Sequence, residues 1–178
     1  MRNKDVATQA IAVLREVLSD EAPYERILLK AAAGAGKSYA LRRMVRDALE
    51  HPRCSRVGIV AFANKQLQPL ASSLGKELGK DRVCLLVSKD WAERVADDTH
   101  LSASVVSSYS DIPDGAEAVI STTHMLERVG WRIKERLGPA ANGERLYDVL
   151  LIDEAWQLPH HRFAPIRWNA PIVVGVGD

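Results

Sequence analysis

The stretch Ala31-Ala32-Ala33-Gly34-Ala35-Gly36-Lys37-Ser38 decides how this sequence is expected to fold. A short apolar run, Ile27-Leu28-Leu29, precedes it and predicts a β-strand. Apolar residues then recur at helical spacing until His51-Pro52 ends the pattern: Ala40, Leu41, Met44, Val45, Ala48 and Leu49. The sequence therefore predicts a strand, a turn of small residues and a helix, in this order.

A strand, a glycine-rich turn and a helix are the setting in which a loop binds phosphate. Small residues let successive backbone N–H groups surround phosphate oxygens, and the helix N-terminus adds its positive end. Lys37 would reach the β- and γ-phosphates of a nucleotide, and the Ser38 hydroxyl would bind Mg²⁺. Ala31 stands where such loops usually have their first glycine. The predicted nucleotide-binding residues of this segment are Ala33, Gly34, Ala35, Gly36, Lys37, Ser38 and Tyr39.

A second apolar run, Val149-Leu150-Leu151-Ile152, ends in the carboxylates Asp153 and Glu154. Ligands collect at the carboxyl ends of parallel strands, so this strand end is expected beside the phosphate loop. Asp153 would hold Mg²⁺, directly or through water, and Glu154 would polarise the attacking water. Acidic residues also often begin a helix, and it is the loop upstream that favours the catalytic interpretation.

The rest of the chain alternates short apolar runs with helical patterns. Strands are expected near residues 57–62, 83–87, 118–120, 149–152 and 172–174, and helices near 5–18, 65–78 and 123–137. This pattern predicts an α/β fold of three layers, with a mostly parallel central sheet covered on both faces. Residues 97–116 are the least regular and are interpreted as a connection with a short strand at Val105-Val106. Trp91, Trp131 and Trp168 are expected to pack in small clusters beside the core.

Composition fits one globular domain. The chain has 178 residues, 47% of them hydrophobic and 26% charged, with a net charge of +1, so no bulk charge attracts nucleic acid or membranes. No apolar run approaches the roughly 18 residues of a membrane span. Cys54 and Cys84 are the two cysteines, which excludes a disulfide scaffold or a Cys-rich zinc site and favours the cytoplasm. Because the sequence stops on an apolar strand at Gly177-Asp178, we expect a truncated fragment of a longer protein.

The ordered set of motifs resembles the first RecA-like domain of superfamily 1 helicases, across nearly the whole chain. Residues 33–38 look like motif I, Val60 to Gln66 is similar to motif Ia, and Ala118 to His124 resembles motif Ib. Asp153-Glu154-Ala155-Trp156-Gln157 looks like motif II in its Asp-Glu-Ala-x-Gln form, and Val173 to Asp178 is similar to the start of motif III. Both the UvrD/Rep-like and the nonsense-decay-like branches fit, and Trp156 is unusual for either.

The resemblance implies a P-loop NTPase fold, ATP and Mg²⁺ as cofactors, and further site residues. Gln157 would sense the γ-phosphate, Gln9 would match the adenine-reading glutamine, and Asp178 would belong to the nucleotide site through motif III. The residues implied to face single-stranded DNA or RNA are Phe62, Asn64, Thr122, Thr123 and His124. A second RecA-like domain, outside residues 1–178, would supply arginines to the transferring phosphoryl group, so this chain alone is expected to be nearly inactive. In this fold the strand near 172–176 lies between the phosphate-loop strand and the Asp153 strand.

Two other functions remain open. The chain could be a P-loop ATPase of another kind, such as a phage packaging motor or a signalling ATPase, in which motifs Ia and Ib are coincidental. It could also be a regulatory module that binds a nucleotide without hydrolysing it. Turnover stimulated by nucleic acid separates the helicase reading from both.

Overall fold

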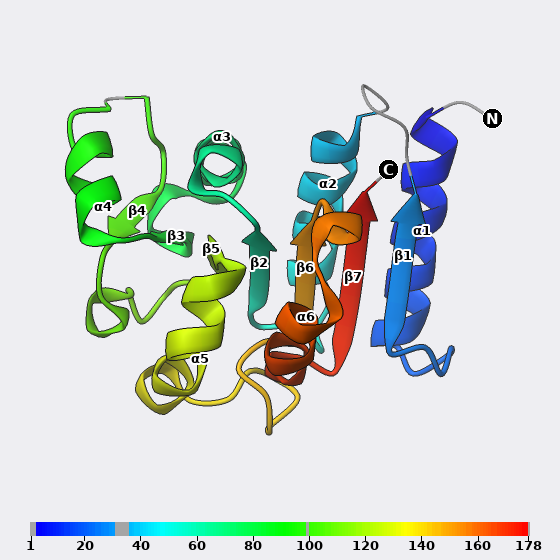
Figure 1. Ribbon diagram of the computed structural model, residues 1–178. Helices are drawn as coiled ribbons and strands as arrows, with labels where there is room; N and C mark the ends of the chain where they lie inside the picture. Colours follow the sequence, from blue (N-terminus) through cyan, green and yellow to red (C-terminus); the bar gives the residue numbers. More distant parts are fainter. Residues whose placement is uncertain (1–2, 31–35, 99, 178) are drawn as a thin grey trace.

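One parallel sheet organises the computed structural model, which describes residues 3–30, 36–98 and 100–177. Among these residues the sheet has seven strands in the order β1-β7-β6-β2-β5-β3-β4, and every neighbouring pair is parallel. The strands are β1 (Arg26–Lys30), β2 (Val57–Ala61), β3 (Val83–Leu86), β4 (Ser104–Val106), β5 (Ala118–Thr122), β6 (Val149–Asp153) and β7 (Ile172–Gly177). The predicted α/β class and parallel sheet are confirmed, and β7 lies between β1 and β6 as expected (Figure 1).

Helices cover both faces of this sheet. They are α1 (Asn3–Leu18), α2 (Lys37–Leu49), α3 (Asn64–Leu78), α4 (Lys89–Val95), α5 (Thr123–Leu137) and α6 (His160–Ile166). Buried side chains from α1, α2 and α3 form one core cluster with one set of alternate strand residues. Those from α5 and α6 form a second cluster with the other set. The two clusters are the two interfaces of a three-layer fold (Figure 1).

The central strands are buried on both faces, which explains their continuous apolar runs. All five residues of β2 and all four of β3 are buried. Gly58 of β2 lies against the Tyr147 ring, where a Cβ atom would come within 2.4 Å of the ring. Tyr147 is 1% exposed, so the absence of a side chain at position 58 is a packing requirement.

A buried carboxylate fixes the connection that enters β6. Asp148 accepts hydrogen bonds from the backbone N–H groups of Ser55 at 2.7 Å and Asn142 at 2.7 Å, and from the Asn142 side-chain amide at 2.7 Å. These bonds hold the chain before β2 and the turn after α5 against the start of β6. Since β6 leads to Asp153, this network helps to set the position of the candidate site.

Strand β1 is the least enclosed strand of the sheet. Its neighbour within the described residues is β7, and it pairs along that edge only. Ile27 and Leu29 are buried towards the first core cluster, whereas Leu28 is 67% exposed on the other face. Strand β1 therefore exposes an apolar side chain, Leu28, on one face of the sheet next to the phosphate loop.

Two features of the fold differ from expectation. The short helices α4 and α6 were not predicted, because each has seven residues and α6 contains Pro165, so neither carries a helical apolar period. Trp131 and Trp168 are 58% and 55% exposed instead of packed, while Trp91 packs against the first core cluster. No helix in the described part of the chain is long and apolar enough to cross a membrane.

Candidate nucleotide-binding site

The start of α2 forms one side of the candidate site. Gly36 takes a left-handed conformation, with φ 80° and ψ 28°, and α2 begins at Lys37. Glycine reaches this conformation without the steric cost that other residues meet. The first helical hydrogen bond runs from the N–H of Ala40 to the carbonyl of Gly36, at 2.9 Å. The N-terminal end of α2 therefore faces the carboxyl end of the sheet, where a phosphate gains from the helix dipole. The predicted residues Ala33, Gly34, Ala35 and Asp178 lie outside the described residues.

The structure brings two predicted catalytic residues together across this site. Lys37 Nζ lies 2.9 Å from Glu154 Oε1, and the two side chains are 14% and 21% exposed. Glu154 directly follows β6, two strands away from β1 in the sheet. The predicted meeting of the Lys37 segment with the Asp153-Glu154 segment is thus observed in the geometry.

Backbone strain accompanies this ion pair. Glu154 has φ 52° and ψ 46°, a left-handed conformation that costs a residue with a Cβ atom about 1–2 kcal/mol. Asp20 is the other non-glycine residue with positive φ in the described part of the chain. Strained residues persist where their surroundings determine them, and they gather at functional sites.

Burial is the main influence on the neighbouring carboxylate, Asp153. It raises the pKa of Asp153 above its ordinary value, and the negative charge of Glu154 raises it further. The N–H of Glu154, which donates to Asp153 Oδ1 at 3.1 Å, and the charge of Lys37 act in the opposite direction. The ionised form of Asp153 is therefore incompletely compensated, and a divalent cation beside it would favour that form.

The oxygen donors of Asp153 and Ser38 suit Mg²⁺ in kind, because this ion prefers carboxylate, hydroxyl and phosphate oxygens. Ser38 lies exposed in the first turn of α2. The residues that the structure describes contain no group of three or more His, Cys, Asp or Glu side chains able to hold a metal by themselves. A Mg²⁺ ion here would take further ligands from phosphate and water, as it commonly does.

Close packing of β7 against the segment after Glu154 explains why positions 175 and 177 are glycines. The sequence alone placed these two residues only in motif III. A Cβ atom on Gly175 would lie 2.9 Å from Ala155 Cβ, and one on Gly177 would lie 3.4 Å from the backbone nitrogen of Ala155. These glycines let residues 155–157 lie directly on β7. Gln157 is exposed there.

Tyr39 and Arg43 contact each other near the start of α2. Only Tyr39 was predicted to take part in the site. Tyr39 was predicted to bind the nucleotide, and it is 44% exposed in the first turn of α2. Arg43 Nη1 donates to Tyr39 Oη at 3.1 Å, and the Arg43 guanidinium lies 6.0 Å from the centre of the Tyr39 ring. Spacing of four residues on a helix is the signal that could have linked the two. Gln9 is exposed on α1.

The five residues predicted to face nucleic acid lie at the carboxyl ends of two paired strands, β2 and β5, where Ala61 is opposite Thr122. Phe62 is 60% exposed, and His124 is exposed in the first turn of α5. The Asn64 side chain has a buried Oδ1 without a hydrogen-bond partner.

The two threonines have local roles that sequence reasoning missed. Thr122 Oγ1 accepts from the N–H of Met125 at 3.1 Å and so caps α5, and Thr123 is 5% exposed. Of the five residues, Phe62 and His124 are therefore the exposed ones.

Comparison of the sequence with protein-family models and with curated proteins gives no match. The structure, however, is similar to solved helicase domains. It matches the Pyrococcus furiosus Hef helicase domain with a TM-score of 0.62 at 14% identity, over 96% of this chain and 32% of that chain. It also matches the UvsW helicase of bacteriophage T4 with a TM-score of 0.56 at 15% identity, over 92% of this chain and 51% of that chain. The chain thus has the RecA-like fold of helicase domains and spans about a third to a half of these neighbours.

Proposed function

We propose that this chain is the nucleotide-binding and hydrolysing motor domain of a helicase-like protein that acts on single-stranded nucleic acid. The observation that carries the proposal is the Lys37–Glu154 ion pair, at the N-terminus of α2 and the carboxyl end of β6. A flexible cation on the first turn of a helix beside two carboxylates is an arrangement suited to a nucleoside triphosphate and its hydrolysis. The helicase-like fold of the neighbours supports this choice over other nucleotide-binding proteins.

Phosphate binding would exchange the partner of Lys37. Its ammonium neutralises Glu154 in the structure. When a triphosphate lies against the helix N-terminus, Lys37 binds β- and γ-phosphate oxygens, which carry more negative charge than one carboxylate. Glu154 is then released to act on water, so the catalytic base becomes available only when substrate is present.

Hydrolysis would follow in one displacement. Glu154 accepts a proton from water, the water oxygen bonds to the γ-phosphorus, and the bond from that phosphorus to the bridging oxygen breaks. Ser38 and Asp153 would hold Mg²⁺, which would neutralise phosphate charge when bound. Gln157 would report the presence of the γ-phosphate to the nucleic-acid face. Arginines from a second RecA-like domain would stabilise the transition state, a contribution of about 10³ to 10⁵ in kcat.

The nucleic-acid face would be formed by Phe62 and His124, with Asn64 beside them. An exposed aromatic ring at a strand end can stack a base, and such stacking contributes about 1–3 kcal/mol per base. Phe62→Ala should weaken binding of a single-stranded oligonucleotide by about tenfold or more while leaving nucleotide binding unchanged, because Phe62 is exposed and not part of the core.

Glu154→Gln tests the proposed hydrolysis directly. The variant should bind a Mg²⁺–nucleotide at least as tightly as the unaltered chain, since Lys37 loses a competing carboxylate, but turnover should fall by about 10² or more. Titration with a fluorescent ATP analogue gives the first quantity. Phosphate release in the presence of single-stranded nucleic acid, measured in a protein that carries this domain together with a second RecA-like domain, gives the second. Undiminished phosphate release by Glu154→Gln would overturn the assignment of the base, and absence of nucleotide binding by the unaltered chain would overturn the proposal itself.

A further inference from the structure

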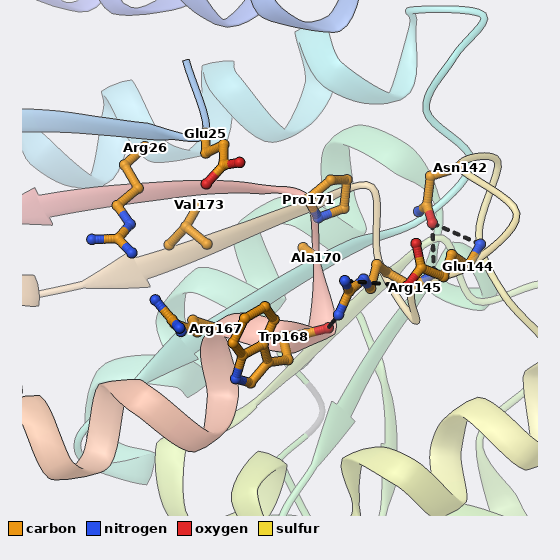
Figure 2. Close-up of a pocket in the computed structure, with 10 residues that line it drawn as sticks. All are labelled: Glu25, Arg26, Asn142, Glu144, Arg145, Arg167, Trp168, Ala170, Pro171 and Val173. Carbon is orange, nitrogen blue, oxygen red and sulfur yellow. Dashed lines mark hydrogen bonds and ion pairs between the residues drawn. The ribbon is translucent and has the colours of Figure 1, made fainter. Parts of the chain in front are cut away.

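A pocket of about 390 Å³ opens at the amino ends of β1 and β7, at the edge of the sheet opposite the candidate nucleotide site (Figure 2). Arg26, the first residue of β1, lies on one side of it, and Arg145, Arg167 and Trp168 line the other. Glu25 and Glu144 contribute carboxylates. None of these residues belongs to the motifs discussed above, so the proposed function leaves the pocket unexplained.

Three arginines line this pocket, and two of them, Arg26 and Arg167, form no ion pair with a carboxylate in the described part of the chain. Arg145 is engaged, because Nη2 lies 3.2 Å from Glu144 Oε1 and Nη1 donates to the Trp168 carbonyl at 3.1 Å. No ion pair joins Arg26 or Arg167 to a carboxylate within the described ranges 3–30, 36–98 and 100–177. The Nε atom of Arg167 is also buried without a hydrogen-bond partner. A buried donor left unpaired is costly, so this pocket is suited to an anion.

Aromatic rings accompany these arginines. The guanidinium of Arg26 lies 5.5 Å from the centre of the Phe163 ring, and that of Arg167 lies 4.1 Å from the Trp168 ring. Arg145 approaches the same indole at 5.5 Å, and Figure 2 shows Arg145 and Arg167 on either side of it. Stacking holds each planar group in a fixed orientation while leaving its N–H donors available to a ligand.

A second hollow, of about 300 Å³, shares the lining residues Glu144, Arg145 and Trp168 with this pocket. Trp131 of α5 lines this second hollow and is 58% exposed, next to Trp168 at 55%. Exposed indoles near the guanidinium groups of Arg26 and Arg167, along two neighbouring hollows, suit an extended ligand that alternates planar bases with phosphates. An acidic peptide would satisfy the arginines but would leave the indoles unused.

We propose that the arginine–tryptophan pocket, defined by Arg26, Arg145, Arg167 and Trp168, binds single-stranded nucleic acid. Arg26 and Arg167 hold a backbone phosphate, and a base packs against the exposed indole surface of Trp168 or Trp131. This contact lies at the amino ends of the strands, whereas Phe62 and His124 lie at their carboxyl ends. The inference does not depend on nucleotide hydrolysis, because no residue of the candidate nucleotide site takes part in it.

The test is a salt titration of binding with the double variant Arg26→Gln/Arg167→Gln. Binding of a fluorescein-labelled oligothymidine to residues 1–178 is followed by fluorescence anisotropy, with Lys37→Ala present in every protein so that the candidate nucleotide site contributes no cation. Each phosphate contact that is lost should reduce the slope of log K against log salt by about 0.7. The double variant Arg42→Gln/Arg46→Gln, which likewise removes two positive charges, from partly exposed positions on α2, is the matched control and should leave affinity unchanged.

Trp168→Ala separates stacking from charge. It should lower affinity by about tenfold, within the range for one stacked base, and leave the salt slope unaltered. If Arg167→Gln lowers the melting temperature, Arg167→Lys replaces it. Lysine keeps the charge but not the planar fork, so affinity should fall at constant slope.

Three results would overturn the proposal. One is an unchanged slope and affinity in the double variant. Another is that poly-glutamate displaces the labelled oligonucleotide as effectively as unlabelled oligothymidine does. This result would indicate a site for an acidic peptide. The third is that this pocket binds a free mononucleotide but does not bind the oligonucleotide. Failure of ATP-analogue binding by the chain with Lys37 intact would instead count against the proposed function and leave the pocket unaffected.

Discussion

Lys37 Nζ and Glu154 Oε1 lie 2.9 Å apart, so the cation proposed to bind phosphate and the carboxylate proposed to activate water neutralise each other. Both side chains are largely buried, at 14% and 21% exposed, which makes the pair stronger than one on the open surface. A bound triphosphate has to compete with Glu154 for Lys37. Nucleotide binding to Lys37 and release of Glu154 from Lys37 are therefore coupled.

Lys37→Ala is expected to lower the affinity for Mg²⁺–ATP by about 10- to 100-fold, because charge-assisted hydrogen bonds contribute about 1.5–3 kcal/mol. Isothermal titration calorimetry with the unaltered chain and the variant measures this loss. Arg46→Gln serves as the control for removal of one positive charge from the same helix. Equal affinity in Lys37→Ala would refute its role in phosphate binding.

Glu154→Gly and Glu154→Ala both remove the carboxylate, but they differ in the backbone. At φ 52° alanine keeps the left-handed strain and glycine relieves it, so we expect the glycine variant to be more stable by about 1 kcal/mol. Urea unfolding followed by circular dichroism gives the free energy of unfolding of each variant. Both variants lack the ion pair with Lys37, so its loss cancels in the difference between them. A more stable alanine variant would show that Glu154 is not held in this conformation.

Asp153→Asn is expected to stabilise the metal-free protein or leave its stability unchanged, although substitutions at partly buried sites usually cost about 1 kcal/mol. The folded state raises the pKa of Asp153, so the native protein binds more protons than the unfolded chain at pH values just above the ordinary pKa of aspartate. The stability of the unaltered chain therefore falls as pH rises through that window, and the asparagine variant should lose this part of the pH dependence.

The same variant should fail to gain stability from Mg²⁺–nucleotide. Ligand at 100 times its dissociation constant adds about 2.7 kcal/mol to a protein that binds it only when folded. Thermal denaturation with and without Mg²⁺–ATP analogue compares the two chains. An equal rise in melting temperature in Asp153→Asn would argue against metal binding at this carboxylate.

The two cysteines offer a test of the core. Burial raises the pKa of both Cys54 and Cys84 to about 12, so near neutral pH both are neutral thiols shielded from reagents. A thiol-specific colorimetric reagent should modify neither in the native chain and both after unfolding. Since an unfolded thiol ionises near pH 8.5, stability should fall as pH rises from there towards 12. Rapid native modification at pH 8 would contradict the packing around β3 and β2.

Much of the fold was predictable because its signals are local. Continuous apolar runs predicted the buried strands, and a glycine-rich turn between a strand and a helix predicted where α2 begins. The proximity of Lys37 to Glu154 followed from one general property, that the carboxyl ends of parallel strands meet at one edge of a sheet.

What could not be predicted depends on tertiary contacts. The left-handed backbone of Glu154 accompanies the packing of residues 155–157 on the glycines of β7, which no local pattern encodes. Thr123 is buried because α5 begins directly at the end of β5, although its residue type suggested a polar surface. Trp168 belongs to a short helical turn with no apolar period, so its exposure became evident only in three dimensions.

The strand that leads into residues 31–35 is an edge strand of the sheet formed by the described residues. β1 has five residues, is hydrogen-bonded along one edge within the described chain, and exposes Leu28 on one face. Local opening of β1 therefore costs less than opening of β2 or β3 and should appear as faster amide hydrogen exchange. A ligand that binds beside Lys37 only when β1 is closed would use part of its binding free energy to keep this strand closed. Nucleotide affinity would then respond to any substitution that alters how firmly β1 is held against β7, including those remote from the phosphates.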